Sequence, residues 1–167
     1  MAARGDALDP TSLAEVAKGH DAVVSAYSPG ADPSKVINAA RALITALPKA
    51  GVKRLVVVGG AGSLKVAPGV QVVDTPQFPE AWKGIALAHR DALEVYRKDA
   101  GALEWTYFSP PALIEPGERT GKFRLGKDQL VADDKGQSRI SAEDYAIALV
   151  DELESPKHVR GRFTAAY

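Results

Sequence analysis

Residues 53–64 read Lys53-Arg54-Leu55-Val56-Val57-Val58-Gly59-Gly60-Ala61-Gly62-Ser63-Leu64, an apolar run that passes directly into a glycine-rich turn. The run is short and valine-rich and does not alternate with polar residues, which is typical of a parallel strand covered on both faces. In open α/β sheets, ligands bind at the carboxyl ends of the strands, and a turn without side chains lets them approach the backbone closely. This pattern predicts the ligand-facing end of a buried strand.

Two similar apolar runs, at residues 22–27 and 105–108, predict two more strands of the same sheet. Amphipathic helices are predicted between them, from Ser34 to Leu47 and from about Glu80 to Lys98, because apolar residues recur there at helical spacing. Alternation of strand and helix indicates βαβ units. The predicted fold class is α/β, a Rossmann-like, doubly wound and mostly parallel sheet with helices on both faces.

Capping residues indicate where the helices begin and end. Asp9 and Asp32 each precede a proline, so each is predicted to cap a helix that has proline at its first position. Pro48 and Gly51 are predicted to stop the second of these helices before the glycine-terminated strand. Ser141 is predicted to open a last helix through a variant capping box.

The composition changes after Pro116. Short strands are predicted at residues 121–125 and 129–132, followed by a polar turn at 133–136. A final strand is predicted at residues 162–167. The length of 167 residues is that of one domain, so residues 1–167 are expected to share a single core.

The charge balance argues against polyanionic partners. Lys plus Arg and Asp plus Glu both number 21, so no overall field favours nucleic acid or an anionic membrane, and a small-molecule site or a protein partner is expected. The chain has no cysteine, which excludes thiol catalysis, and its three histidines show no metal-ligand spacing, so no metal is predicted. No signal core or apolar stretch long enough to span a bilayer is seen, so a cytoplasmic location is expected.

The glycine turn does not match the known phosphate loops. A G-x-G-x-x-G pattern starting at Gly60 would need glycine where Lys65 stands, and a Walker pattern starting at Gly59 would need glycine at Leu64. Two interpretations remain open: a tight strand exit that uses glycine for backbone geometry, and a turn that contacts a ligand.

The order and spacing of several segments resemble the atypical short-chain dehydrogenase/reductase superfamily. Within it, the chain is similar to the small NAD(P)H-binding proteins related to NADPH-dependent flavin reductase and biliverdin reductase B. The resemblance implies hydride transfer from NADPH or NADH, with NADPH favoured, to a small conjugated substrate such as a flavin. It also implies βα repeats in residues 1–116 and a C-terminal substrate-side segment in 117–167. The segments that carry it are residues 5–6, 20–27, 51–63, 103–110 and 139–146.

The resemblance also assigns roles to single residues. Asp6 would lie near the adenine, and the end of the first predicted strand would follow the ribose and pyrophosphate. The glycine turn would flank the nicotinamide, the end of the third strand would back its ring, and Ser63 would make a polar catalytic contact. The alternatives are a turn or cap role for Asp6, packing for Tyr27 and a turn-capping hydroxyl for Ser63. The expected cofactor-binding residues are Asp6, Ala26, Tyr27, Ser28, Gly59, Gly60, Ala61, Ser109 and Pro110.

The chain departs from the family pattern in two respects. The family's first strand, glycine-rich phosphate loop, first helix and second strand should precede Gly5, so the chain is predicted to be N-terminally truncated. The Tyr-x-x-x-Lys pair of many dehydrogenases would fall near Ala86 and Arg90, so no tyrosine acid is expected. A structural or solvent role is expected for each of the three histidines, and among them His89 remains the candidate for a proton donor. The alternative function is a non-catalytic nucleotide-sensing or protein-interaction module on the same fold.

Overall fold

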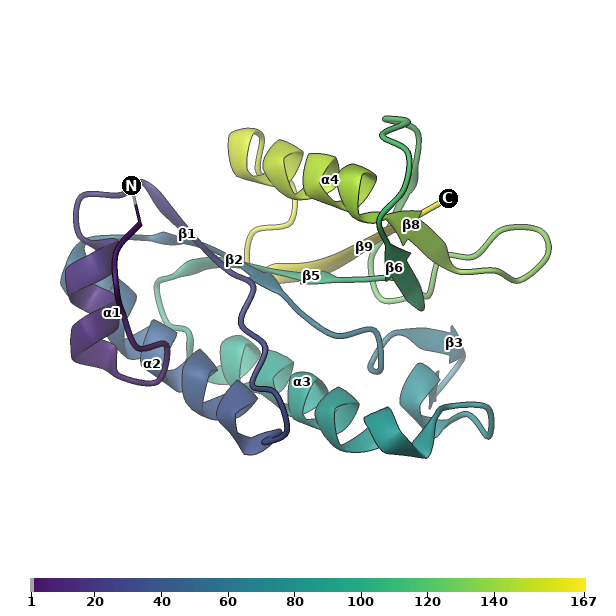
Figure 1. Ribbon diagram of the computed structural model, residues 1–167, viewed down its shortest axis with the longest axis horizontal. Coiled ribbons are helices and arrows are strands. Elements are labelled where there is room, and N and C mark those ends of the chain that lie inside the picture. Colours follow the sequence, from purple (N-terminus) through teal and green to yellow (C-terminus); the bar gives the residue numbers. More distant parts are fainter. Residues whose placement is uncertain (1) are drawn as a thin grey trace.

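A five-stranded sheet forms the centre of the protein in the computed structural model, which describes residues 2–167 (Figure 1). Its order is β1-β2-β5-β9-β7, with β7 antiparallel to β9 and the other neighbours parallel. This arrangement confirms the predicted α/β class. The strands are β1 (Ala22–Ser25), β2 (Arg54–Val58), β5 (Glu104–Ser109), β9 (Gly161–Ala166) and β7 (Arg124–Gly126).

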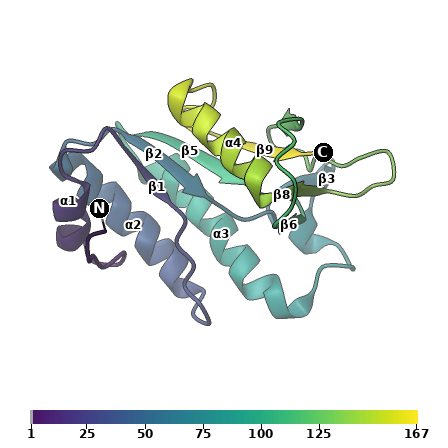
Figure 2. The ribbon, with the colours of Figure 1, turned by 45° about the horizontal axis from the view of Figure 1, so that its top comes forward.

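Helices cover both faces of this sheet (Figures 1 and 2). Helices α1 (Pro10–Ala17), α2 (Ser34–Ala50) and α3 (Glu80–Asp99) lie on one face, and α4 (Ala142–Glu154) lies on the other. Alternate side chains of β5 serve the two layers, because Trp105 and Tyr107 pack under α2 and α3 while Phe108 packs against α4. The sheet is therefore buried on both faces over its central strands, as valine-rich runs predict.

The predicted cap of the first helix is confirmed, whereas α2 begins at Ser34 with Pro33 at its cap position, one residue later than predicted. The Asp9 carboxylate accepts a hydrogen bond from the main chain of Thr11 at 2.9 Å, and the Asp32 carboxylate accepts one from Ser34 at 3.1 Å. The predicted stop at Pro48 is wrong, because α2 continues through Pro48 to Ala50. A proline so close to the end removes one helical hydrogen bond only, and the helix ends where Gly51 adopts a left-handed conformation with φ 75°.

The C-terminal third follows the prediction less closely. In place of the strand predicted at residues 121–125 the structure has the shorter β7, which ends at Gly126, and residues 129–132 form no strand. Main-chain groups of Asp128 and Leu130 instead bond Lys65, which makes only an isolated bridge. Ser141 caps α4 as predicted, since its hydroxyl accepts the Asp144 main-chain N–H at 3.0 Å.

Short elements that the sequence did not indicate complete the structure. They are β3 (Lys65–Ala67), which pairs antiparallel with β4 (Val70–Gln71), the 3₁₀ turn η1 (Val72–Asp74), and β6 (Leu113–Glu115), which pairs parallel with β8 (Arg139–Ser141).

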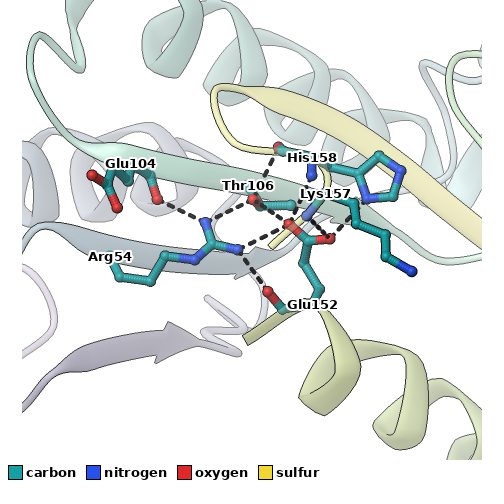
Figure 3. A network of polar contacts seen from close by, with 6 residues as sticks. All are labelled: Arg54, Glu104, Thr106, Glu152, Lys157 and His158. Atoms are coloured by element: carbon teal, nitrogen blue, oxygen red, sulfur yellow. Dashed lines mark hydrogen bonds and ion pairs between the residues drawn. The ribbon is translucent and has the colours of Figure 1, made fainter. Parts of the chain in front are cut away.

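A buried polar network joins α4 to the amino ends of β2 and β5 (Figure 3). The Arg54 guanidinium donates to the Glu152 carboxylate at 3.0 Å and to the Thr106 hydroxyl at 2.7 Å. Glu152 also accepts from the His158 ring at 2.8 Å and from the main chain of Lys157 at 3.1 Å. Only 4% of Glu152 is exposed. The network closes the end of the sheet opposite to the glycine turn.

Candidate functional site

A cavity of about 490 Å³ lies at the carboxyl ends of β2 and β5, where open α/β sheets bind ligands. Its floor is the glycine turn, one side is the amino-terminal half of α3, and the other side is the segment that follows β5. The volume falls within the range of small-molecule sites. The lining residues are Gly59, Gly60, Ala61, Gly62, Val72, Thr75, Gln77, Phe78, Pro79, Trp82, Ile85, Ala86, His89, Pro110, Pro111, Ala112 and Ile114.

The glycines of the turn are required by their neighbours in the protein. A Cβ at Gly59 would stand 1.9 Å from Cε1 of Tyr107, and one at Gly60 would stand 2.8 Å from the Cβ of His89. A Cβ at Gly62 would stand 2.8 Å from the Cβ of Ala86. The tight-exit interpretation therefore accounts for the composition of the turn. The cavity above the same turn is what points to a ligand, because it leaves the backbone of residues 59–61 partly accessible.

His89, which lines the cavity, forms a polar pair with the buried Tyr107. The Tyr107 hydroxyl donates to the His89 carbonyl oxygen at 2.8 Å and also contacts Nδ1 of the His89 ring at 3.2 Å. Burial raises the pKa of Tyr107, an effect that the main chain of Gly60 opposes in part, and burial lowers the pKa of His89. Both side chains are therefore neutral at physiological pH. The sequence contained both residues, but it gave no signal that the strand and the helix would bring them together.

The outer wall of the cavity is apolar. Phe78 and Pro79 lead into α3, the Trp82 side chain is 62% exposed at the rim, and Ile114 faces it at 41% exposed. Large apolar side chains at a cavity mouth favour a ligand with a flat, unsaturated ring. A second cavity of about 450 Å³ lies beside β8 and residues 115–122 and reaches Tyr167 after β9, but several charged, exposed side chains line it and it does not touch the ends of β2 and β5.

The predicted site residues fall into groups along one edge of the sheet. Gly59, Gly60, Ala61 and Pro110 line the large cavity. At the adjacent end of β1, Ala26 and Tyr27 line a smaller cavity of about 200 Å³, and Ser28 is exposed beyond them. Because β1, β2 and β5 are neighbours in the sheet, these positions lie side by side.

Three further predicted residues, Asp6, Ser63 and Ser109, line neither of these two cavities. Ser109 is fully buried behind Pro110, and its hydroxyl has no hydrogen-bond partner among residues 2–167. Ser63 is 4% exposed, and its hydroxyl accepts from the buried guanidinium of Arg162 at 2.7 Å. Asp6 precedes α1, where its carboxylate accepts from the main chain of Leu8 at 2.9 Å. The contact of Asp6 is that of its turn alternative, whereas the Ser63 hydroxyl binds a side chain that is distant in the sequence.

The sequence model described as NAD(P)H-binding matches residues 2–156. This chain belongs to the NAD(P)H-binding family. The predicted resemblance is thereby confirmed.

Three solved structures are similar to this member of the NAD(P)H-binding family over 98% of its length. A presumed exported protein from Burkholderia pseudomallei is 55% identical, with a TM-score of 0.92 over 79% of that chain. A presumed epimerase from Bacteroides thetaiotaomicron is 43% identical, with a TM-score of 0.91 over 74% of that chain. A presumed NADH-flavin reductase from Streptococcus pneumoniae TIGR4 is 34% identical, with a TM-score of 0.83 over 79% of that chain. The shared architecture confirms the Rossmann-like prediction.

The cavity suits the nicotinamide group that the NAD(P)H-binding family binds. A planar ring needs a flat floor, which the turn at Gly59 and Gly60 supplies because it has no side chains, and apolar walls, which Pro110 and Ile85 supply. Within residues 2–167, no three acidic or histidine side chains come together as metal ligands. None of the helices described is both long enough and apolar enough to cross a membrane.

Proposed function

We propose that this protein is an NAD(P)H-dependent reductase that transfers a hydride to a small, flat, conjugated acceptor such as a flavin. The observation that carries the proposal is the apolar cavity of about 490 Å³ built on the glycine turn at the strand ends. It is large enough for two stacked rings and lies where this fold class binds its ligands. The flavin-reductase name of one 34% identical structure supports the acceptor class.

The side chains of the cavity would act by positioning rather than by covalent chemistry. The dihydronicotinamide supplies the hydride when it is bound. The backbone at Gly60 and Ala61 would seat one ring, and Pro110 would limit its movement from the side of β5. Trp82 and Ile114 would cover the acceptor and exclude water. Holding two reactants in register can account for much of a rate enhancement. We further propose NADPH as the preferred donor and Ser63 as a residue that supports the turn through Arg162.

One observation favours a second candidate, a nucleotide-binding module without catalysis. The positions of the dehydrogenase Tyr-x-x-x-Lys pair hold Ala86, which packs against the glycine turn, and Arg90, which pairs with Asp91 at 3.1 Å. Neither supplies an acid to the cavity, and the hydroxyl of Ser63, which was predicted to make a polar catalytic contact, accepts a hydrogen bond from the buried Arg162 instead. Binding of a dinucleotide without turnover of any acceptor is the result that this candidate predicts.

Titration with NADPH and NADH, followed by nicotinamide fluorescence, tests the first step. Oxidation of the bound dinucleotide on addition of FMN or lumiflavin tests the second. Absence of binding of either dinucleotide at millimolar concentration would contradict both candidate functions.

A matched pair of variants tests where the acceptor binds. Trp82→Ala removes the aromatic rim of the cavity and is expected to raise the KM for the flavin roughly tenfold, which corresponds to the loss of one aromatic stacking contact. Val150→Ala is the control, because Val150 is 46% exposed on α4, on the other face of the sheet. Equal KM values for the two variants would place the acceptor outside the cavity.

A further inference from the structure

The Tyr107 hydroxyl has one hydrogen, and the geometry leaves it one acceptor. The His89 carbonyl oxygen lies 2.8 Å from the hydroxyl oxygen, and a carbonyl can only accept. Two oxygens at this distance need a proton between them, so the single hydrogen of Tyr107 points at the carbonyl. The phenol oxygen can then act toward the His89 ring only as an acceptor.

This arrangement determines the tautomer of His89. Nδ1 lies 3.2 Å from the Tyr107 oxygen, and since that oxygen has no hydrogen left to give, Nδ1 must carry the proton and donate. Burial lowers the pKa of His89, which keeps the ring neutral and leaves it one proton only. Nε2 therefore carries an unprotonated lone pair.

The ring edge that contains Nε2 lies beside the glycine turn. A Cβ at Gly60 would stand 3.5 Å from Cδ2 of His89, the carbon bonded to Nε2, and both residues line the large cavity. The opposite edge, with Nδ1, is the one bound to Tyr107. Within residues 2–167, the hydrogen bonds of His89 involve its Nδ1 and its carbonyl oxygen, and no group bonds Nε2. A half-buried acceptor is thus left without a partner where a ligand would bind.

We propose that Nε2 of His89 accepts a hydrogen bond from the amide or imide N–H of a planar heterocycle bound in the large cavity. The inference rests on the proposed function and deepens it, because it names the group by which the ligand is recognised. It also replaces the role of proton donor expected for His89: a neutral ring protonated on Nδ1 offers the cavity an acceptor. A site of this kind discriminates against ligands that lack the N–H, because its acceptor would stay unpaired.

Two ligand pairs distinguish the two sources of such an N–H. Lumiflavin carries an imide N–H that 3-methyllumiflavin lacks, and NADPH carries a carboxamide N–H that its reduced 3-acetylpyridine analogue lacks. The wild-type protein is expected to bind the N–H member of one pair about tenfold more tightly, as one buried hydrogen bond allows. Discrimination in the first pair assigns the contact to the acceptor, and discrimination in the second assigns it to the cofactor. Equal affinity within both pairs overturns the proposal.

Two substitutions of similar size test His89 itself. The amide of His89→Gln reaches the position of Nε2, whereas the amide of His89→Asn reaches only that of Nδ1. We expect His89→Gln to keep most of the discrimination and His89→Asn to lose it, with thermal unfolding used to verify that both variants fold. Discrimination that survives in His89→Asn overturns the proposal while leaving the reductase function intact. Absence of all ligand binding by the wild type removes both.

Nitrogen NMR of the imidazole provides a measurement that needs no ligand. The neutral ring is expected to be protonated on Nδ1, and Tyr107→Phe is expected to shift the population toward the other tautomer. Protonation on Nε2 in the wild-type protein would overturn the proposal directly.

Discussion

Replacing Glu152 by Gln is expected to destabilise the protein more than replacing its partner Arg54 by Met. Among residues 2–167, Glu152 is the only carboxylate that pairs with the Arg54 guanidinium, at 3.0 Å, and side-chain exposures of 9% for Arg54 and 3% for Glu152 leave neither group to water. Glu152→Gln preserves the shape of the side chain but leaves the Arg54 charge buried without its partner. Removal of one partner of a buried pair costs about 3–5 kcal/mol.

The reverse substitution should cost less, for a reason visible in the network. In Arg54→Met, the Glu152 carboxylate still accepts from the His158 ring and from the main chain of Lys157 and His158. Its charge therefore stays solvated by protein donors, and the expected loss is that of the charged hydrogen bonds to Arg54, about 1–3 kcal/mol. The predicted order of destabilisation is Glu152→Gln first and Arg54→Met second.

Urea unfolding followed by far-ultraviolet circular dichroism measures these differences as shifts of the midpoint at constant slope. The control is Glu154→Gln, two residues along the same helix on its exposed side, which should change the free energy of unfolding by less than about 0.5 kcal/mol. If Glu152→Gln proved as stable as Glu154→Gln, or more stable than Arg54→Met, the argument from the uncompensated arginine would be refuted.

Three further outcomes follow from the structure. Burial alone would raise the pKa of Glu152, but hydrogen bonds from His158 and Lys157 outweigh it and hold this pKa below its ordinary value of 4.5. The stability that Glu152 contributes is therefore present above about pH 4.5 and is lost on further acidification. The difference in the free energy of unfolding between wild type and Glu152→Gln should accordingly narrow in unfolding curves recorded below about pH 4. Gly59→Ala forces a Cβ to within 1.9 Å of a tyrosine ring and should lower the free energy of unfolding by about 1–3 kcal/mol or more. Gly84 lies in α3, and the Cβ of Gly84→Ala would meet nothing closer than 3.6 Å, so this variant should be more stable by about 0.5–1 kcal/mol. Both changes are read from the urea midpoint. Asp144→Asn should make residues 115–122 more mobile, because the fully buried Asp144 carboxylate accepts a hydrogen bond from the Gly121 main-chain N–H at 2.8 Å. The expected result is faster amide hydrogen exchange at Gly121 without a change in β5. Unchanged exchange at Gly121 would contradict this role.

The elements with strong local signals could be predicted from the sequence. The valine run of β2 was recognisable because a buried parallel strand needs no polar alternation, and α2 because its apolar residues form one stripe. Asp9, Asp32 and Ser141 indicated where helices begin, because the side chain of each accepts a hydrogen bond from a main-chain N–H two or three residues further along. The position of the candidate site followed from the same rule, since the carboxyl ends of neighbouring parallel strands share an edge.

What could not be predicted depends on contacts between distant parts of the chain. The hydroxyl of Ser63 suited a catalytic role until the fold brought Arg162, 99 residues away, within 2.7 Å of it. Pairing of β6 with β8 joins three-residue strands that have no pattern of their own. The contact between His89 and Tyr107 requires α3 to pack on β5, and nothing near either residue in the sequence indicates it.

The polar network and the cavity lie at opposite ends of β2. This strand runs from Arg54, in the network, to Val58, next to the glycine turn, a length of about 13 Å. Substitutions that far apart and without shared partners have nearly additive effects on the free energy of unfolding. Residues around the cavity can therefore be exchanged, in evolution or by design, without drawing on the interactions that fasten α4 to the sheet. A fold of this kind can acquire new substrates at one end of the sheet while the polar network at the other end preserves its stability.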